Sequence, residues 1–427
     1  MKYRYKLSGL VSLLGLTALS LIPTTAQTAR NVNLPQAAPA VLTGIDVLIQ
    51  SGFTPLRGRR IGLVTNQTGV TRDGRPTIDV LARAPGLKLV ALFGPEHGVR
   101  GTVAAGRTVK SGRDPQTGLP VYSLYGGTRK PTAAMLRGVD TLVFDIQDIG
   151  SRSYTYIATM GECMEAADAR RIPFVVLDRP NPLGGNRIEG NIPAPRFRSF
   201  IGPYPIPYRH GLTVGELARM INGRGWLAGK ARCQLTVIPL QGYRRAMRWE
   251  ETGLPWVQTS PNIPYVHSPF FYAATGIVGE LSTLSIGIGT RYQFEVAGAP
   301  DLDAYALAAE LNRRGMAGFA FEPVSWQPSN GAHRNRLCTG VQIRVSDANR
   351  AELTRLNFEL MDAVRRIAPT RSFFAVRSKN HMFDLACGTD GVRRLFTAGK
   401  SAAQMWAAWN SGSVAFREQR KPYLLYQ

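Results

Sequence analysis

The sequence of 427 residues predicts an α/β protein with an open, doubly wound and mostly parallel sheet, followed by a smaller α+β or α/β domain. Short apolar runs alternate with segments of helical periodicity, a pattern typical of βαβ units. The runs are apolar throughout and do not alternate with polar residues, as expected of strands covered on both faces. The length fits two domains.

The first half supplies the elements of the parallel sheet in order. Strands are predicted at RIGLVTN (60–66), LKLVALFG (87–94), VYSLYG (121–126), DTLVFDIQDIG (140–150), PFVVLDRPNP (173–182) and QLTVIPL (234–240). Helices are predicted at TIDVLARA (77–84), PTAAMLRGV (131–139), YIATMGECMEAADARR (156–171) and TVGELARMING (213–223). WVQTSPNIPYVHSPFFYA (256–273) is predicted to be a Pro-rich loop around the domain boundary.

Two domains and an export signal follow from these patterns. The second domain is predicted at 267–427, with strands FAFEPVSW and GVQIRVSD among helices, and the first at 42–266. At the N-terminus, MKYRYK precedes an apolar run and a small-residue site ending at Ala26, which is typical of a signal peptide over 1–26. Residues 27–41 form a loose lead-in. The chain is therefore expected to be exported, periplasmic or extracellular, without stable membrane insertion after signal removal. A retained anchor is the alternative.

Charge and motif content narrow the classes of function. The formal net charge of +23 favours an anionic partner. No nucleic-acid-binding motif appears, so an anionic cell-wall polymer or membrane surface is a better candidate than nucleic acid. The alternative is that the organism's exported proteins are basic in general, without a specific anionic partner. GxGxxG, GxxxxGK[ST] and GxSxG are all absent. Neither the four cysteines nor the five histidines have zinc-site spacing, so no metal is predicted, and the cysteines are expected to be mostly free, buried thiols.

Polar residues follow four of the predicted strands. In an open parallel sheet, ligands bind beyond the carboxyl ends of the strands, so these residues are the candidates for a site. They are Asn66; Glu96 and His97; Asp145, Asp148, Arg152 and Tyr154; and Asp178, Arg179 and Asn181. Each has a structural alternative: an Asx turn for Asn66, a helix cap for Asp145 or Asp148, and an ion pair for Asp178 with Arg179.

Carboxylates beside tyrosines, amides and arginines suit carbohydrate chemistry. Glycoside hydrolysis needs a carboxylic acid that protonates the leaving oxygen, and often a second as base or nucleophile. Glu96 is a candidate for the acid, because a glutamate next to an apolar strand could have the raised pKa that a general acid needs at neutral pH. Asp145, Asp148 or Asp178 could supply the second group. Ser151 and Ser153 also allow an esterase, although neither lies in a nucleophile elbow.

Several long motifs resemble one family. VTNQTG (64–69), LFGPEHGVRG (92–101), GLPVYSLYG (118–126), DTLVFDIQDIGSRSYTYIATM (140–160), LDRPNPLGG (177–185) and SPNIP (260–264) closely resemble the NamZ-type exo-β-N-acetylmuramidases. The resemblance is co-linear over 43–427. It implies a Rossmann-like first domain, no redox cofactor, and release of terminal N-acetylmuramic acid from the non-reducing ends of peptidoglycan fragments.

Carried over by position, the resemblance implies Glu96 as general acid, with His97, Asp145 and Asp148 as further catalytic candidates. Substrate-binding candidates are Asn66, Arg152, Tyr154, Asp178, Arg179, Asn181 and Glu280. Arg152 or Arg179 would suit the lactyl carboxylate of muramic acid. Ile288 stands where the family often has arginine, which puts the sugar preference in question. A non-catalytic periplasmic sugar-binding protein is the alternative function.

Overall fold

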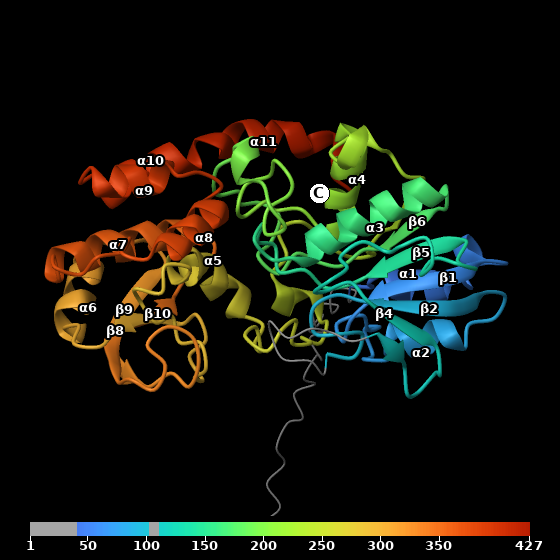
Figure 1. The fold of residues 1–427 in the computed structure, drawn as a ribbon, viewed down its shortest axis with the longest axis horizontal. Helices are drawn as coiled ribbons and strands as arrows, with labels where there is room; N and C mark the ends of the chain where they lie inside the picture. Colours follow the sequence, from blue (N-terminus) through green and yellow to red (C-terminus); the bar gives the residue numbers. More distant parts are fainter. Residues whose placement is uncertain (1–40, 102–110) are drawn as a thin grey trace, which may run out of the picture. The chain divides into compact units, whose positions relative to one another are not determined.

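The computed structural model describes residues 41–101 and 111–427. The predicted signal peptide, the lead-in up to residue 40 and the middle of the Gly- and Arg-rich loop lie outside the described residues. A seven-stranded sheet and a three-stranded sheet form the framework, each with its own helices (Figure 1). The predicted fold class is confirmed: a mostly parallel α/β sheet is followed by a smaller part with an antiparallel sheet.

The large sheet has the strand order β3-β4-β2-β1-β5-β6-β7. All its neighbours are parallel except β3 and β4, which pair antiparallel at the edge. The strands are β1 (Arg60–Thr65), β2 (Lys88–Gly94), β3 (Gly112–Arg113), β4 (Pro120–Ser123), β5 (Thr141–Asp145), β6 (Phe174–Leu177) and β7 (Leu235–Ile238). The chain runs outward from β1 to β2 and β4, then crosses to the other side of β1 as β5. The carboxyl ends of β1 and β5 therefore flank a topological switch point, the usual place for a ligand in this type of sheet.

Helices cover both faces of this sheet, which explains the apolar runs. On one face, α3 (Tyr156–Arg170) and α4 (Val214–Arg224) pack on side chains such as Val64 and Phe144. On the other face, α1 (Gly44–Gln50) and α2 (Thr77–Ala82) pack on side chains such as Leu63 and Val143. Neighbouring residues of one strand point to opposite faces, so consecutive central residues of β1 (Leu63, Val64) and β5 (residues 142–144) are apolar.

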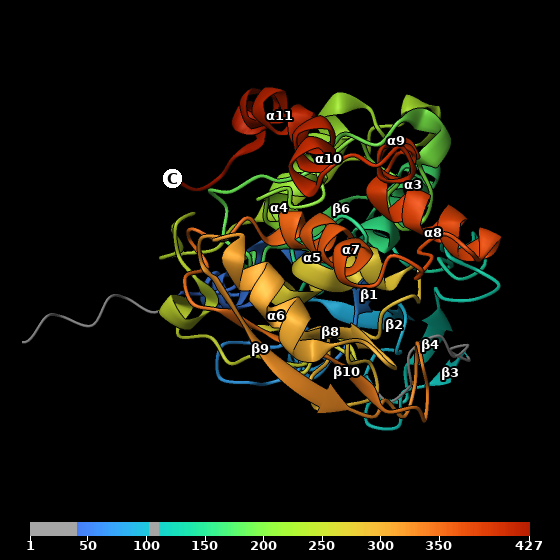
Figure 2. The ribbon, with the colours of Figure 1, turned by 90° about the vertical axis from the view of Figure 1, so that its left-hand side faces the viewer.

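The second half contains the antiparallel sheet β8-β10-β9, with β8 (Val296–Ala299), β9 (Phe319–Trp326) and β10 (Cys338–Val345). Helix α6 (Ala304–Arg313) lies against this sheet, and α5 (Ser268–Gly279) and α7 (Leu356–Ile367) pack together beside it (Figure 2). The remaining helices are α8 (Arg377–Cys387), α9 (Gly391–Thr397), α10 (Ala402–Trp409) and α11 (Ser413–Arg420).

Two local predictions were wrong. Residues 131–139 form turns instead of a helix, with short-range bonds such as Val139 N–H to Leu136 O (3.1 Å), because Pro131 and Gly138 bracket too few residues to propagate one. The predicted loop over 256–273 ends early, since α5 begins at Ser268 with Pro269 in its first turn.

All four cysteines lie within the described residues, where they are buried and form no disulfide, as expected. Over 41–101 and 111–427, no helix is long and apolar enough to cross a membrane.

Candidate active site

Glu96 lies on a tight turn just beyond β2. The Gly98 N–H donates to Pro95 O (3.0 Å), and both His97 and Gly98 have left-handed backbones, with φ of 75° and 77°. A left-handed histidine is uncommon, and such conformations concentrate at functional sites. The turn buries His97 and leaves Glu96 half-buried at the carboxyl edge of the sheet.

Two tyrosines lie close to Glu96. Burial raises the pKa of the Tyr125 phenol, and the charge of Glu96 and a hydrogen bond to it raise that pKa further. Burial also holds the pKa of Tyr156 well above its usual range, with contributions from Tyr154 and from the Glu96 charge. Both phenols therefore stay protonated at neutral pH, and Tyr125 is the one that is hydrogen-bonded to the Glu96 carboxyl group.

Tyr154 and Tyr156 come from the segment that follows β5 and begins α3. Their rings are packed edge to face with centroids 4.9 Å apart. The Tyr156 hydroxyl donates to Thr259 O (2.6 Å), and the Tyr154 hydroxyl donates to Thr259 Oγ1 (2.8 Å). These bonds attach the Pro-rich loop after residue 256 to the carboxyl edge of the sheet.

Asn66 follows β1 and closes an Asx turn. Its Oδ1 accepts from the backbone and the hydroxyl of Thr68 (2.9 and 2.5 Å), and Thr68 Oγ1 accepts from the Gln147 N–H (2.9 Å). Asn66 therefore does form the Asx turn that was its structural alternative. The same residue also lies near the site: its side chain partly offsets the raised pKa of Tyr156, and its buried Nδ2 has no hydrogen-bond partner among the described residues.

Asp148 is a buried carboxyl group after β5. Its Oδ1 accepts from the Gly150 N–H (2.7 Å), while Oδ2 has no hydrogen-bond partner among the residues that the structure describes. Burial raises the pKa of Asp148 to about 7. Its charge in turn raises the pKa of Tyr154, so the two side chains belong to one group. A carboxyl with this pKa exchanges protons near neutral pH, which is the property that a general acid or base needs.

Asp145 and Arg179 form a buried ion pair with each other. Arg179 Nε and Nη2 donate to the two Asp145 oxygens (2.5 and 2.9 Å), and the Thr77 hydroxyl also donates to Oδ2 (2.5 Å). Arg179 further donates to Val70 O (2.8 Å). These hydrogen bonds connect β5, the end of β6 and the start of α2 within the protein.

Asp178 and Asn181 are likewise bonded within the protein. Asp178 is fully buried and accepts from the hydroxyls of Thr213 (2.8 Å) and Tyr426 (2.5 Å); burial raises its pKa to about 6. Asn181 donates to Leu212 O (2.9 Å) and accepts from the Leu183 N–H (2.9 Å). Both side chains hold loops after β6.

Arg152 is bonded to the second half of the chain, and Glu280 lies within that half. Arg152 is buried and donates to the carbonyls of Asn191, Ile206 and Ala386 (2.7, 3.0 and 2.9 Å). Glu280 ends α5, and its charge raises the pKa of Tyr208 and Tyr272. Those two hydroxyls both contact Ser153 Oγ (2.8 and 2.9 Å). Ile288 packs against the core of the second half.

The structure therefore brings together Asn66, Glu96, Asp148 and Tyr154, with His97 on the Glu96 turn. It places Asp145, Arg179, Asp178, Asn181 and Arg152 in bonds to the protein itself. The catalytic and binding roles of all these residues stay predictions. Sequence reasoning missed Tyr125, Thr259 and Tyr272 as members of the group. Tyr125 follows β4, so the strand-end rule applied to that strand would have found it.

Neither the fold nor the side chains indicate a metal centre. In the ranges that the structure describes, no three His, Cys, Asp or Glu residues are grouped as metal ligands. Two carboxyl groups are placed for acid–base chemistry. Glu96 lies among phenols, and the pKa of Asp148 is raised to about 7.

A group of carboxyls and tyrosines at the carboxyl edge of a doubly wound sheet fits the acid–base chemistry of a glycoside hydrolase, and comparison with known proteins shows that class. Family models of the exo-β-N-acetylmuramidase NamZ match residues 61–267 (N-terminal domain) and 270–426 (C-terminal domain). The chain belongs to the NamZ exo-β-N-acetylmuramidase family. The predicted family and enzyme class are confirmed by these matches and by a curated relative.

That relative is the peptidoglycan β-N-acetylmuramidase NamZ of Bacillus subtilis (strain 168), which is 42% identical over 421 residues and 98% of each chain. Two crystal structures of DUF1343 family proteins from Bacteroides fragilis NCTC 9343 are also similar. One has a TM-score of 0.87 and 44% identity, covering 92% of this chain and all of that one. The other has a TM-score of 0.74 and 32% identity, covering 91% and 99%.

Proposed function

We propose that this protein is an exported exo-acting glycosidase that releases terminal N-acetylmuramic acid from the non-reducing ends of peptidoglycan fragments, with Glu96 as the general acid. Family membership and the 42% identity to a peptidoglycan β-N-acetylmuramidase support the substrate class. The single observation that carries the role of Glu96 is its position on the left-handed turn after β2, facing Tyr125 and Tyr156.

The reaction needs one proton at the leaving oxygen and one water at the anomeric carbon. Glu96, when protonated, gives its proton to the glycosidic oxygen as the bond from that oxygen to the anomeric carbon breaks. The oxygen of water forms the new bond to that carbon, and the proton that water loses restores the acid. Asp148 is the candidate for the second carboxyl group of the reaction, because the pair of Tyr154 and Tyr156 interacts both with it and with Glu96.

The phenols support this role of Glu96 by fixing its position. The raised pKa values of Tyr125 and Tyr156 keep both groups protonated, so neither competes as an acid, and Tyr125 is hydrogen-bonded to Glu96. Preorganised donors of this kind lower the cost of charge that develops during bond breaking.

The deciding experiment compares a disaccharide with N-acetylmuramic acid at its non-reducing end and one with N-acetylglucosamine there. We expect wild type to release free N-acetylmuramic acid from the first only. Glu96→Gln keeps the size of the side chain but has no acidic proton, so kcat should fall about 10²–10⁴-fold with little change in Tm.

Glu322→Gln is the matched control, because Glu322 is an exposed glutamate paired with Arg344 on β9 and β10. It should retain full activity. Retained binding of the muramic disaccharide without turnover by wild type would instead indicate a sugar-binding protein. Equal rates for Glu96→Gln and wild type would remove Glu96 from the mechanism.

Export rests on the predicted signal over 1–26 and is tested separately. Mass spectrometry of the protein recovered from its own cells should give a mature chain that begins after Ala26. Recovery of the uncleaved chain from the cytoplasm would refute export and leave the enzymatic proposal intact.

A further inference from the structure

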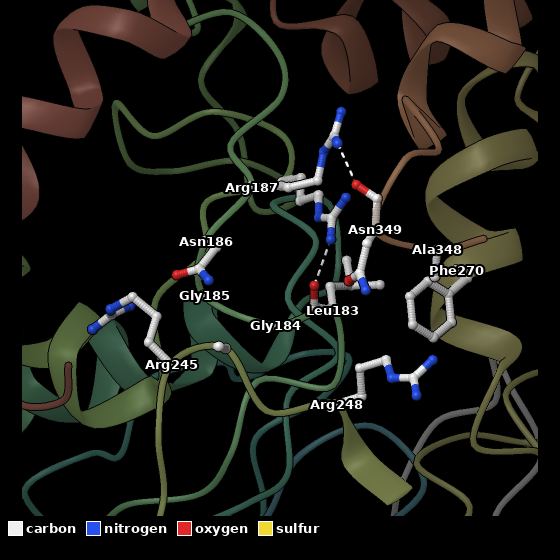
Figure 3. A pocket seen from close by; sticks show the side chains of 12 residues that line it. Leu183, Gly184, Gly185, Asn186, Arg187, Arg245, Arg248, Phe270, Ala348 and Asn349 are labelled. Atoms are coloured by element: carbon white, nitrogen blue, oxygen red, sulfur yellow. Dashed lines mark hydrogen bonds between the residues drawn. The ribbon is translucent and has the colours of Figure 1, made fainter. Parts of the chain in front are cut away.

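A pocket of about 320 Å³ lies away from Glu96, between loops of the first half and segments of the second (Figure 3). The first half contributes the loop after β6 and the segment around residue 245. The second half contributes α5 and the turn after β10. The residues that line it are Leu183, Gly184, Gly185, Asn186, Arg187, Arg209, Arg245, Ala246, Arg248, Phe270, Ala348 and Asn349.

Four arginines line this arginine pocket, and none of its lining residues carries a carboxylate. The pocket is distinct from the tyrosine group, here Tyr154, Tyr208 and Tyr272 with Ser153, although consecutive residues join the two. The Tyr208 hydroxyl contacts Ser153 on the side of the tyrosine group, whereas Arg209 lines the arginine pocket.

Two of the arginines are buried and held rigidly. Arg209 donates to Glu189 Oε1 (2.8 Å) and to Leu183 O (2.5 Å), and Arg245 donates to Glu216 and to Gly211 O (2.9 Å). Arg209 is 3% exposed, and its Nε has no hydrogen-bond partner among the residues that the structure describes. A buried donor without an acceptor is costly, so a ligand oxygen here would be stabilising.

Charge within the pocket is incompletely balanced. Burial lowers the pKa of Arg209, and repulsion from Arg187 adds to this despite the bond to Glu189. Arg187 lies 3.8 Å from the same Glu189, which therefore serves two arginines. Arg187 also donates to Asn349 O across the pocket (Figure 3).

Arg248 is the most exposed of the four. Its side chain is 53% exposed, and its contact with Glu251 is long, at 3.7 Å. The pocket thus has one rigid guanidinium, of Arg209, and two adaptable ones, of Arg187 and Arg248. The guanidinium of Arg245 instead points away and is bonded within the protein (Figure 3).

We propose that the arginine pocket binds the phosphate group of a phosphate ester. A phosphate presents several acceptor oxygens and up to two charges, so it can engage more than one guanidinium fork at once, whereas a single carboxylate fills one fork. Phe270, Ala246 and Ala348 supply an apolar wall for the organic part of the ester. This binding is independent of the glycosidase activity.

The test is calorimetric titration of the full chain with inorganic phosphate at constant ionic strength. Wild type should show saturable binding. Arg187→Gln with Arg248→Gln removes the two more accessible charges of the pocket and leaves the Arg209–Glu189 and Arg245–Glu216 pairs intact, so affinity should fall about tenfold or more while Tm without ligand changes little. The matched control is Arg196→Gln with Arg313→Gln, two arginines of 68% exposure outside the pocket that pair with Asp390 and Glu310.

Phenyl phosphate and diethyl phosphate identify the source of the group. Equal affinity for both would indicate a phosphodiester polymer, and preference for phenyl phosphate would indicate a terminal monoester. The rate of N-acetylmuramic acid release by the pocket double variant should stay within about twofold of wild type, since Arg187 and Arg248 are outside the Glu96 group. Equal phosphate affinity in all three proteins, or no saturable binding by wild type, would overturn the proposal.

Discussion

Two sets of polar residues follow the strands of the large sheet, and they differ in what they bond. Asp145, Arg179 and Asp178 are buried and bonded to other parts of the protein. Glu96 and Asp148 lie among phenols. The first set joins neighbouring strands and loops, and the second provides carboxyl groups at the place where a ligand binds in such a sheet.

The comparison teaches that position at a strand end does not by itself separate structural residues from chemical ones. A buried carboxylate with a bidentate arginine has its charge compensated within the fold. A buried carboxyl without a cationic partner instead has a raised pKa, as Asp148 does among the phenols and as Asp178 does within the first set. Three substitutions test this distinction, in order of decreasing effect.

The largest effect is expected for Asp145→Asn. Removing the charge leaves Arg179 buried and uncompensated, so the free energy of unfolding should fall by about 3–5 kcal/mol. Urea denaturation measures this loss. Activity per folded molecule should change much less than in Glu96→Gln.

Glu322→Gln is again the control, because its pair with Arg344 is more than half exposed on both sides and should contribute under about 1 kcal/mol. If Asp145→Asn unfolds at the same urea concentration as wild type and loses all activity, then Asp145 belongs with Glu96 and Asp148.

Asp148→Asn should change the pH dependence of stability. The pKa of Asp148 is raised to about 7 in the folded protein from the ordinary value of 3.8, so the folded state holds the proton more tightly. This contribution is complete below about pH 4 and is lost as pH rises through 7. Relative to Asp148→Asn, wild type should therefore lose on the order of a few kcal/mol between pH 4 and 7.

Urea denaturation at pH 4, 5.5 and 7 provides the measurement. The raised pKa of Asp178 gives a trend of the same sign in both proteins, so it cancels in the difference. Parallel stability profiles for the two proteins would mean that the Asp148 carboxyl is ionised in the fold.

The smallest effect is expected for Gly98→Ala. Gly98 has φ of 77°, where a side chain is strained, so the free energy of unfolding should fall by about 1–2 kcal/mol. Because Gly98 shares its turn with Glu96, kcat should also fall. Gly127→Ala is the control, since a Cβ there would meet nothing within 4 Å. Equal kcat in the two variants would show that the turn does not position Glu96.

Much of the fold could be predicted because apolar periodicity reports burial directly. Strands β1, β2, β5 and β6 fall within the predicted runs, since both of their faces are covered. The helix predicted at 131–139 failed because its propensity was not supported by packing over enough residues. The early start of α5 was missed because Pro269 signals both loops and first helical turns.

For the site, the sequence by itself determined which residues follow the strands, and its motifs determined the family. Only the tertiary structure decided which of those residues pair with each other. The Asp145–Arg179 pair joins residues 34 positions apart, and the Tyr154–Thr259 bond joins residues 105 positions apart. The arginine pocket likewise collects residues from 183 to 349. Local sequence sets the period and direction of each element, but contacts between distant residues depend on how whole elements pack.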